Sequence, residues 1–140
     1  MGQADVIRLS VPASLKYLDV VGACVTSLLA RVEGLPEPSL AVSHVQLAVH
    51  EACVNIVSHA YAGEPAGRIE ITLRITPQPR RLIVELSDTG RSFDPAKVPV
   101  PNLEEAQEHG YGLFLVRECM DEVSYDARPG ANRWRLVKNL

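Results

Sequence analysis

Three polar side chains lie four residues apart in a segment whose other residues suit a buried helix. Glu51, Asn55 and His59 occur within HEACVNIVSHAY (50–61), where the apolar residues recur at helical spacing. Residues four apart share one face of an α-helix, so the spacing predicts a carboxylate, a carboxamide and an imidazole on one stripe. Such a stripe is commonly no more than a solvated helix face, and a function requires further groups opposite it.

Two glycine-containing clusters are candidates for those further groups. DTG (88–90) directly follows an apolar, strand-like segment, and GYG (110–112) opens a segment with helical spacing. Taken alone, DTG is typical of a turn in which the aspartate bonds its own backbone. GYG alone is typical of a flexible helix start. Each cluster therefore has an ordinary structural explanation when it is considered by itself.

Together the clusters suit the phosphate end of a magnesium nucleotide. The Asn55 carboxamide is a neutral oxygen ligand that fits an octahedral Mg²⁺ shell shared with phosphate and water. Glu51, one turn earlier, can accept a proton from a hydroxyl or water that attacks the terminal phosphate. The backbone N–H groups of Gly110 and Gly112 belong to a predicted helix N-terminus, where the helix dipole favours phosphate.

The DTG cluster suits the base of the same ligand. Asp88, at the end of a predicted strand, can accept a hydrogen bond from the exocyclic amine of adenine. Gly90 is expected to leave space for the ring. If the three clusters converge in space, the sequence predicts a site for ATP and Mg²⁺.

Composition narrows the classes of partner. The 140 residues are 46% hydrophobic, with a formal charge of −3 and no basic block, so neither nucleic acid nor an anionic membrane is expected. The first residues lack a signal-peptide pattern, and no apolar run approaches the roughly 20 residues of a membrane span. We therefore expect a cytoplasmic protein with protein or small-molecule partners. Cys24, Cys53 and Cys119 are widely spaced in apolar helical patterns, which predicts core thiols.

An ordered set of helices and strands must position these clusters. The pattern predicts a strand, two helices, two strands, a long loop, a helix and two strands, over residues 5–13, 14–34, 38–61, 68–76, 82–88, 89–110, 111–123, 123–127 and 133–140. The first strand is expected to place Val6, Leu9 and Val11 in the core. Three helices with apolar stripes can cover one face of the sheet, so we predict an α/β fold, a two-layer sandwich of the α+β kind, as one domain over residues 1–140.

The clusters resemble the nucleotide-binding boxes of the anti-sigma-factor serine/threonine kinases (anti-sigma regulatory factors) of the GHKL, or histidine-kinase-like, ATPase superfamily. The N box resembles EACVNIVSHAY (51–61), the G1 box resembles DTGRSFDP (88–95), and the G2 box resembles HGYGLFLV (109–116). MDEVSY (120–125) is also similar to a segment of that family. The resemblance runs from about Leu40 to the C-terminus, and three boxes in order are more specific than any one of them.

This resemblance implies a Bergerat ATP-binding fold, in which helices cover one face of a mixed, mostly antiparallel sheet. It implies ATP and Mg²⁺ as cofactors, phosphorylation of a serine in a STAS-type anti-anti-sigma protein, and sequestration of a sigma factor, and it allows a homodimer. Glu51 would be the general base and Asn55 the metal ligand. The nucleotide-binding residues that it implies are Asn55, His59, Asp88, Gly90, Phe93, His109, Gly110, Tyr111, Gly112 and Leu113.

The chain departs from that family in its last hairpin and in its lid, which is short between Asp94 and Gly110. EEAQEHG (104–110) is acidic, with only His109 where related kinases often carry a basic lid residue. The last hairpin contains GANRWRL (130–136) where the family often has Gly-Thr-Thr-like residues. We therefore keep a second hypothesis: a binding module that retains ATP, or only the fold, and acts by sequestering a protein.

Two protease hypotheses fail on the sequence. Val54 stands where a zinc protease of the H-E-x-x-H type, begun by His50 and Glu51, requires its second histidine. The DTG of aspartic proteases belongs to almost wholly β chains, whereas this chain is rich in helical patterns.

Overall fold

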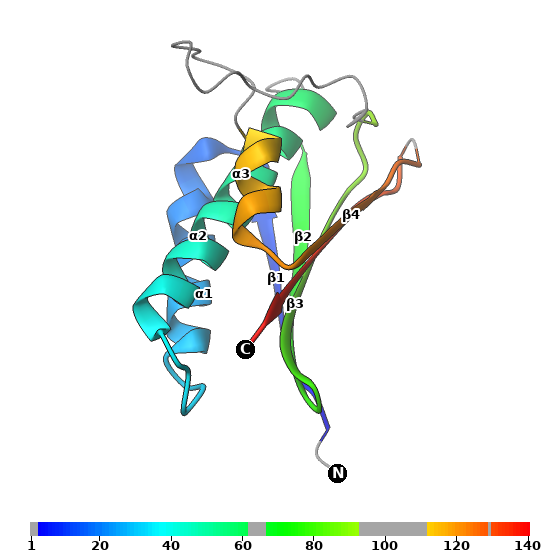
Figure 1. Ribbon diagram of the computed structural model, residues 1–140. Helices are drawn as coiled ribbons and strands as arrows, with labels where there is room; N and C mark the ends of the chain where they lie inside the picture. The colour runs from blue at the N-terminus through cyan, green and yellow to red at the C-terminus, as the bar shows by residue number, and fades with distance from the viewer. Residues whose placement is uncertain (1–2, 62–66, 93–111, 129) are drawn as a thin grey trace, which may run out of the picture.

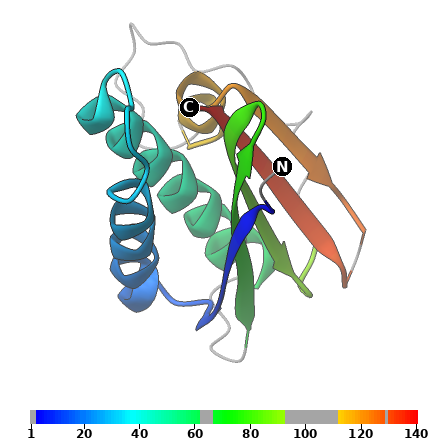
Figure 2. The ribbon, with the colours of Figure 1, turned by 90° about the horizontal axis from the view of Figure 1, so that it is seen from below.

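Helices and strands form two separate layers. The computed structural model describes residues 3–61, 67–92, 112–128 and 130–140 (Figure 1). Its elements in chain order are β1 (Asp5–Pro12), the 3₁₀ turn η1 (Leu15–Tyr17), α1 (Leu18–Leu29), α2 (Pro38–Asn55), the π-helical turn η2 (Ile56–Ala60), β2 (Arg68–Pro77), β3 (Arg80–Asp88), α3 (Gly112–Cys119), β4 (Glu122–Asp126) and β5 (Asn132–Asn139). All helices lie on one face of the sheet (Figure 2), which confirms the predicted α+β sandwich.

The five strands are ordered β1-β2-β3-β5-β4 across the sheet. All pairings among the described strands are antiparallel, so the expectation of a mixed sheet is wrong in this respect. The antiparallel helices α1 and α2 return the chain to the end of the sheet where β1 finished, and Pro12 there pairs with Arg68. β2 therefore runs against β1, without the crossover that parallel neighbours need.

The core lies between the helices and the sheet. Ile69, Ile71 and Leu73 of β2 are buried beneath the helical layer, as their period-two spacing predicts. Burying an Ile or Leu side chain in this way contributes about 1.5–3 kcal/mol relative to leaving it exposed. Trp134 of β5 is also buried and contacts Tyr125 of β4, with ring centroids 4.5 Å apart.

One predicted core residue of β1 is wrong. Val6 is 38% exposed and pairs with Arg74 on the face of the sheet that carries no helix. Successive side chains of a strand point to opposite faces, so Val6 cannot share a face with Leu9 and Val11. Ile7 takes the core-facing position instead, near the exposed end of the strand.

The first helical segment is shorter than its pattern predicts. The Ser14 side chain accepts a hydrogen bond from the Lys16 backbone N–H at 3.3 Å, so it caps the 3₁₀ turn rather than α1 itself. α1 ends at Leu29, and the Arg31 N–H bonds the carbonyl three residues back at 3.1 Å, which tightens the last turn. Gly34, the predicted end, lies beyond the helix with a φ of 73°.

α2 and η2 form one continuous helix over residues 38–60, close to the predicted 38–61. By length and composition alone this helix could cross a membrane. The sequence analysis did not predict any stretch of this kind. Within the structure, Val45, Ala48, Val49 and Ala52 are buried. Its apolar stripe therefore belongs to the core between the helices and the sheet.

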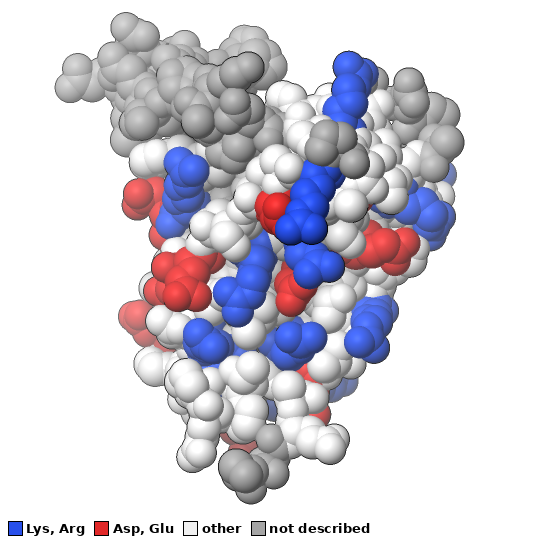
Figure 3. Space-filling model, turned by 90° about the vertical axis from the view of Figure 1, so that its right-hand side faces the viewer, with Lys and Arg blue, Asp and Glu red and all other residues white. Residues whose placement is uncertain are grey.

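The face of the sheet without helices carries charges of both signs (Figure 3). Glu85 of β3 lies between Arg74 of β2 at 3.9 Å and Arg133 of β5 at 3.7 Å. Arg135 and Glu122 form a similar pair at 3.9 Å. Exposed pairs of this kind stabilise a fold by only about 0–1 kcal/mol each, so they keep this face hydrated rather than hold the sheet together.

The three cysteines are free and differ in exposure. Cys53 and Cys119 are buried, as predicted, whereas Cys24 on α1 is partly exposed. Burial raises the pKa of Cys53 to about 12. Burial also raises the pKa of Cys119, and the nearby Lys138 partly opposes that effect.

We expect Cys24 to react with iodoacetamide first and Cys53 last in the folded protein. Alkylation requires the thiolate, and a pKa of about 12 leaves roughly one Cys53 thiol in 10⁴ ionised at pH 8. Timed quenching and mass spectrometry measure the three rates, and denaturant should bring them close together. Labelling of Cys53 as fast as Cys24 in the native protein would contradict the packing of α2.

Candidate functional site

The start of α3 lies directly against the polar stripe of α2. A Cβ atom added to Gly112 would lie 3.0 Å from Glu51 Oε2 and 3.6 Å from Asn55 Oδ1. A larger residue would therefore push the two helices apart or displace the carboxylate. The structure thus brings together Glu51, Asn55 and Gly112, which the sequence placed in two separate clusters.

The Asn55 side chain has an unsatisfied polar atom at this contact. Its Nδ2 atom is buried and has no hydrogen-bond partner within the part of the chain that the structure describes. A buried amide left without a partner costs about 1–3 kcal/mol, so proteins rarely retain one without a reason. Because Nδ2 is a donor and lies beside the N-terminus of α3, it is suited to a ligand that offers an acceptor oxygen.

The predicted stripe is regular only as far as Asn55. From Ile56 to Ala60 the helix is π-helical, and the Tyr61 N–H bonds the Ile56 carbonyl five residues back at 3.3 Å. The regular α-helical spacing of the predicted stripe therefore ends before His59. His59 is exposed at the end of the helix.

Asp88 is buried at the end of β3, only 4% exposed. Its Oδ1 atom accepts hydrogen bonds from the Gly90 backbone N–H and from the Asn132 side chain, each at 2.9 Å. The carboxylate therefore forms the predicted turn with its own backbone and, in addition, a buried contact to β5.

The structure gives a steric reason for a glycine at position 90. A Cβ atom at Gly90 would lie 2.3 Å from the Ala60 carbonyl oxygen, a distance that no side chain tolerates. The Arg91 N–H also donates to that carbonyl at 2.8 Å. The end of the α2–η2 helix therefore occupies the space that a side chain at position 90 would take.

Tyr61 joins the parts of the site through its hydroxyl, a role that the sequence analysis did not predict. Its hydroxyl accepts a hydrogen bond from the Thr89 backbone N–H at 2.9 Å and donates to the Arg68 carbonyl at 2.8 Å. The phenol thus joins the end of the helix to both β2 and the residue after Asp88. A tyrosine that closes an apolar helix just before a loop was the signal available in the sequence.

Asn132, the first residue of β5, was also missed. It is fully buried, and its Nδ2 atom lies 2.9 Å from Asp88 Oδ1, 3.0 Å from the Gly90 carbonyl oxygen and 2.9 Å from the Arg91 carbonyl oxygen. The signal was its alternation with Trp134, which predicts a polar residue on the core face of the last strand.

Of the remaining predicted site residues, the structure describes Leu113. Leu113 is 5% exposed and belongs to the hydrophobic core. Phe93, His109, Gly110 and Tyr111 lie outside the described residues.

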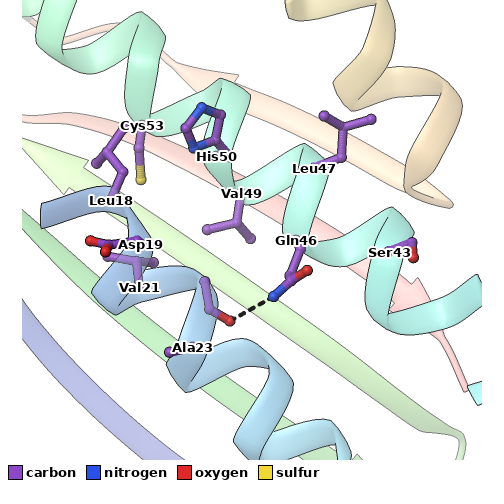
Figure 4. A pocket seen from close by; sticks show the side chains of 11 residues that line it. Leu18, Asp19, Val21, Ala23, Ser43, Gln46, Leu47, Val49, His50 and Cys53 are labelled. Carbon is purple, nitrogen blue, oxygen red and sulfur yellow. Dashed lines mark hydrogen bonds between the residues drawn. The ribbon is translucent and has the colours of Figure 1, made fainter. Parts of the chain in front are cut away.

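A separate cavity of about 560 Å³ lies between α1 and α2 (Figure 4). Asp19, Gln46 and His50 contribute to its lining, and the Gln46 amide donates to the Gly22 carbonyl at 3.1 Å. Glu51, Asn55 and His59 do not line this cavity, and neither do Asp88, Gly90 and Gly112. The chemistry predicted from the sequence therefore lies on the α3 side of α2 and at the end of β3.

The chain matches known protein kinases over most of its length. Residues 11–138 match the family described as the histidine kinase-like ATPase domain. The serine-protein kinase RsbW of Bacillus subtilis (strain 168) is 30% identical over 135 residues, which cover 91% of this chain and 81% of the relative. The serine/threonine-protein kinase BtrW of Bordetella bronchiseptica is 39% identical over 98 residues, or 66% of this chain and 67% of the relative.

Solved structures show the same fold. The RsbU and RsbW domains of a Mycobacterium tuberculosis protein match with a TM-score of 0.67 at 16% identity, over 97% of this chain and 32% of that longer chain. The histidine kinase domain of an Erythrobacter litoralis blue-light activated histidine kinase matches with a TM-score of 0.60 at 17% identity, over 92% of this chain and 61% of that one. The match over residues 11–138 and the identity to RsbW and BtrW show that the chain belongs to the histidine kinase-like (GHKL) ATPase family, among the RsbW-like serine-protein kinases.

Proposed function

We propose that the protein binds Mg-ATP and phosphorylates a serine of a STAS-type anti-anti-sigma protein, and that it also sequesters a sigma factor in the cytoplasm. The observation that carries the proposal is the approach of Gly112 to within contact of Glu51 and Asn55. It joins a candidate proton acceptor, a neutral oxygen ligand and a helix N-terminus at one point. Membership of the RsbW-like kinases supports the same reaction.

The residues present fit a magnesium nucleotide. The buried Asn55 Nδ2 atom has no partner in the described residues, and Gly112 leaves room beside Glu51 and Asn55 that a Cβ atom would fill. When bound, Mg²⁺ would neutralise charge on the phosphates. Asn55 would supply a metal ligand, and the backbone N–H groups at the start of α3 would favour the phosphates.

Two carboxylates would carry out proton transfer and recognition of adenine. Glu51 would accept the proton of the attacking serine hydroxyl, since it is the carboxylate at the Gly112 contact. Asp88 would accept a hydrogen bond from the exocyclic amine of adenine. Its burial at the end of β3 suits a short, well-directed contact rather than a hydrated one.

A binding-only module is the second candidate. The observation that favours it is the acidic sequence EEAQEHG before Gly112, which has no lysine or arginine to meet a terminal phosphate. Such a protein would hold ATP, or only the fold, and act by sequestering a protein partner. Incubating the protein with Mg-ATP and a STAS-type partner, followed by mass spectrometry for phosphoserine, separates the two candidates.

Asp88→Asn should weaken ATP binding by about tenfold or more, because the change replaces a carboxylate oxygen by a competing donor. Isothermal titration calorimetry measures the change. Asp126→Asn is the matched control, since Asp126 closes β4 at the same end of the sheet but is exposed. Equal ATP affinity for Asp88→Asn and wild type would remove Asp88 from the site.

Asn55→Ala should weaken ATP binding mainly when Mg²⁺ is present, because the lost group is an oxygen ligand of the ion. Titrations with Mg²⁺ and with EDTA give the two affinities. A loss of the same size in EDTA would mean that Asn55 contacts the nucleotide or the fold rather than the metal.

Glu51→Gln should reduce phosphate transfer by about 10²–10⁴-fold while ATP affinity stays close to that of wild type. The amide keeps the size of the side chain but cannot accept the proton. Glu118→Gln, on an exposed position of α3, is the control. Transfer at the wild-type rate by Glu51→Gln would refute its role as base, and a wild type that binds ATP without transferring phosphate would favour the binding-only module.

A further inference from the structure

Asn132 joins the end of β3, the residues that follow it and the start of β5. We propose that Asn132 is a positioning residue for recognition of adenine, which orients the Asp88 carboxylate toward the exocyclic amine and fixes the backbone of Gly90 and Arg91. This inference rests on the proposed ATP site. It adds a residue that acts through Asp88, and it makes a separate prediction about which base the site prefers.

The Asn132 amide has a defined orientation. Its Nδ2 atom lies within 3.0 Å of three acceptors, namely Asp88 Oδ1 and the carbonyl oxygens of Gly90 and Arg91. Its Oδ1 atom accepts a hydrogen bond from the Ser92 hydroxyl at 2.7 Å. Rotating the amide by half a turn would set an oxygen against three acceptors, so only one orientation satisfies the surroundings.

This contact fixes the orientation of the Asp88 carboxylate. Asp88 Oδ1 receives two N–H donors, from Gly90 and from Asn132, both at 2.9 Å. In the described part of the chain no hydrogen bond reaches Oδ2. Two bonds on one oxygen fix the plane of the carboxylate, and the other oxygen keeps its capacity to accept the amine of a base.

The backbone beside Asp88 is equally constrained. Each of the three N–H groups of residues 89–91 has a partner: the Tyr61 hydroxyl, the Asp88 carboxylate and the Ala60 carbonyl, in that order. Asn132 binds two of the carbonyl groups from the opposite side. A segment held in this way is organised before any ligand arrives, so little conformational entropy is lost on binding.

A purely structural role for Asn132 predicts a different result. If Asn132 only stabilised the strands, its loss would weaken the binding of every nucleotide by the same factor. If Asn132 orients Asp88, its loss should weaken the binding of nucleotides with a 6-amino group and leave the binding of those with a 6-oxo group unchanged. ATP and inosine triphosphate differ at this position of the base, so the ratio of their dissociation constants separates the two roles.

The test measures binding of both nucleotides to the full chain by isothermal titration calorimetry. For wild type, ATP should bind more tightly than inosine triphosphate. Asn132→Leu, which keeps a similar volume, should lower that preference about tenfold, since one charged hydrogen bond loses its geometry. Ser92→Ala should lower it less, because Asn132 then loses only the partner of its oxygen. Asn139→Leu, at the exposed far end of β5, should leave it unchanged.

The outcomes separate this inference from the proposed function. Ser92→Ala keeps the test decisive if Asn132→Leu fails to fold, as judged by circular dichroism and thermal unfolding. An unchanged preference in a folded variant, or equal weakening of both nucleotides, overturns the inference and leaves the ATP site intact. A wild type that binds neither nucleotide overturns the proposed function and this inference together.

Discussion

The burial of α2 is the constraint on which the rest of the structure depends. This helix lies on the sheet, with α1 packed on one side and α3 on the other. Its apolar stripe is buried in those contacts, so Glu51 and Asn55 lie on the side of α2 that faces α3. Gly112 at the start of α3 allows a close approach to them without displacing the Glu51 carboxylate. Core packing and the arrangement of polar groups are therefore consequences of the same helix position.

Antiparallel pairing explains why the second polar cluster forms where it does. The end of one strand lies beside the start of its antiparallel neighbour, and Asp88 pairs in register with Asn132. Both residues occupy core-facing positions of their strands, where a lone carboxylate or amide would be costly. They satisfy one another, and the remaining bonds hold residues 90–92. The end of β3 and the start of β5 therefore carry a compact polar cluster rather than a simple turn.

Strong periodicity made most of the fold predictable from the sequence, and contacts between distant segments account for the misses. The alternation of β2 and the spacing along α2 specified their buried faces. Val6 was assigned to the wrong face because the prediction ignored the two-residue alternation of side chains along a strand. The π-helical turn at Ile56–Ala60 has no pattern in the sequence. The reason for Gly90 is its contact with the end of a helix about thirty residues earlier, and the partner of Asn132 is similarly remote. Such pairings become visible only in three dimensions.

Both ends of the candidate site rest on one continuous helix. Position 51 meets the start of α3, and position 60 holds the backbone of Gly90 and Arg91. At about 1.5 Å per residue, this stretch of helix spans roughly 14 Å. A helix does not stretch, so inserting or deleting one residue between these positions would rotate and displace one end relative to the other. Any ligand that reaches both ends is therefore selected by its length as well as by its chemistry.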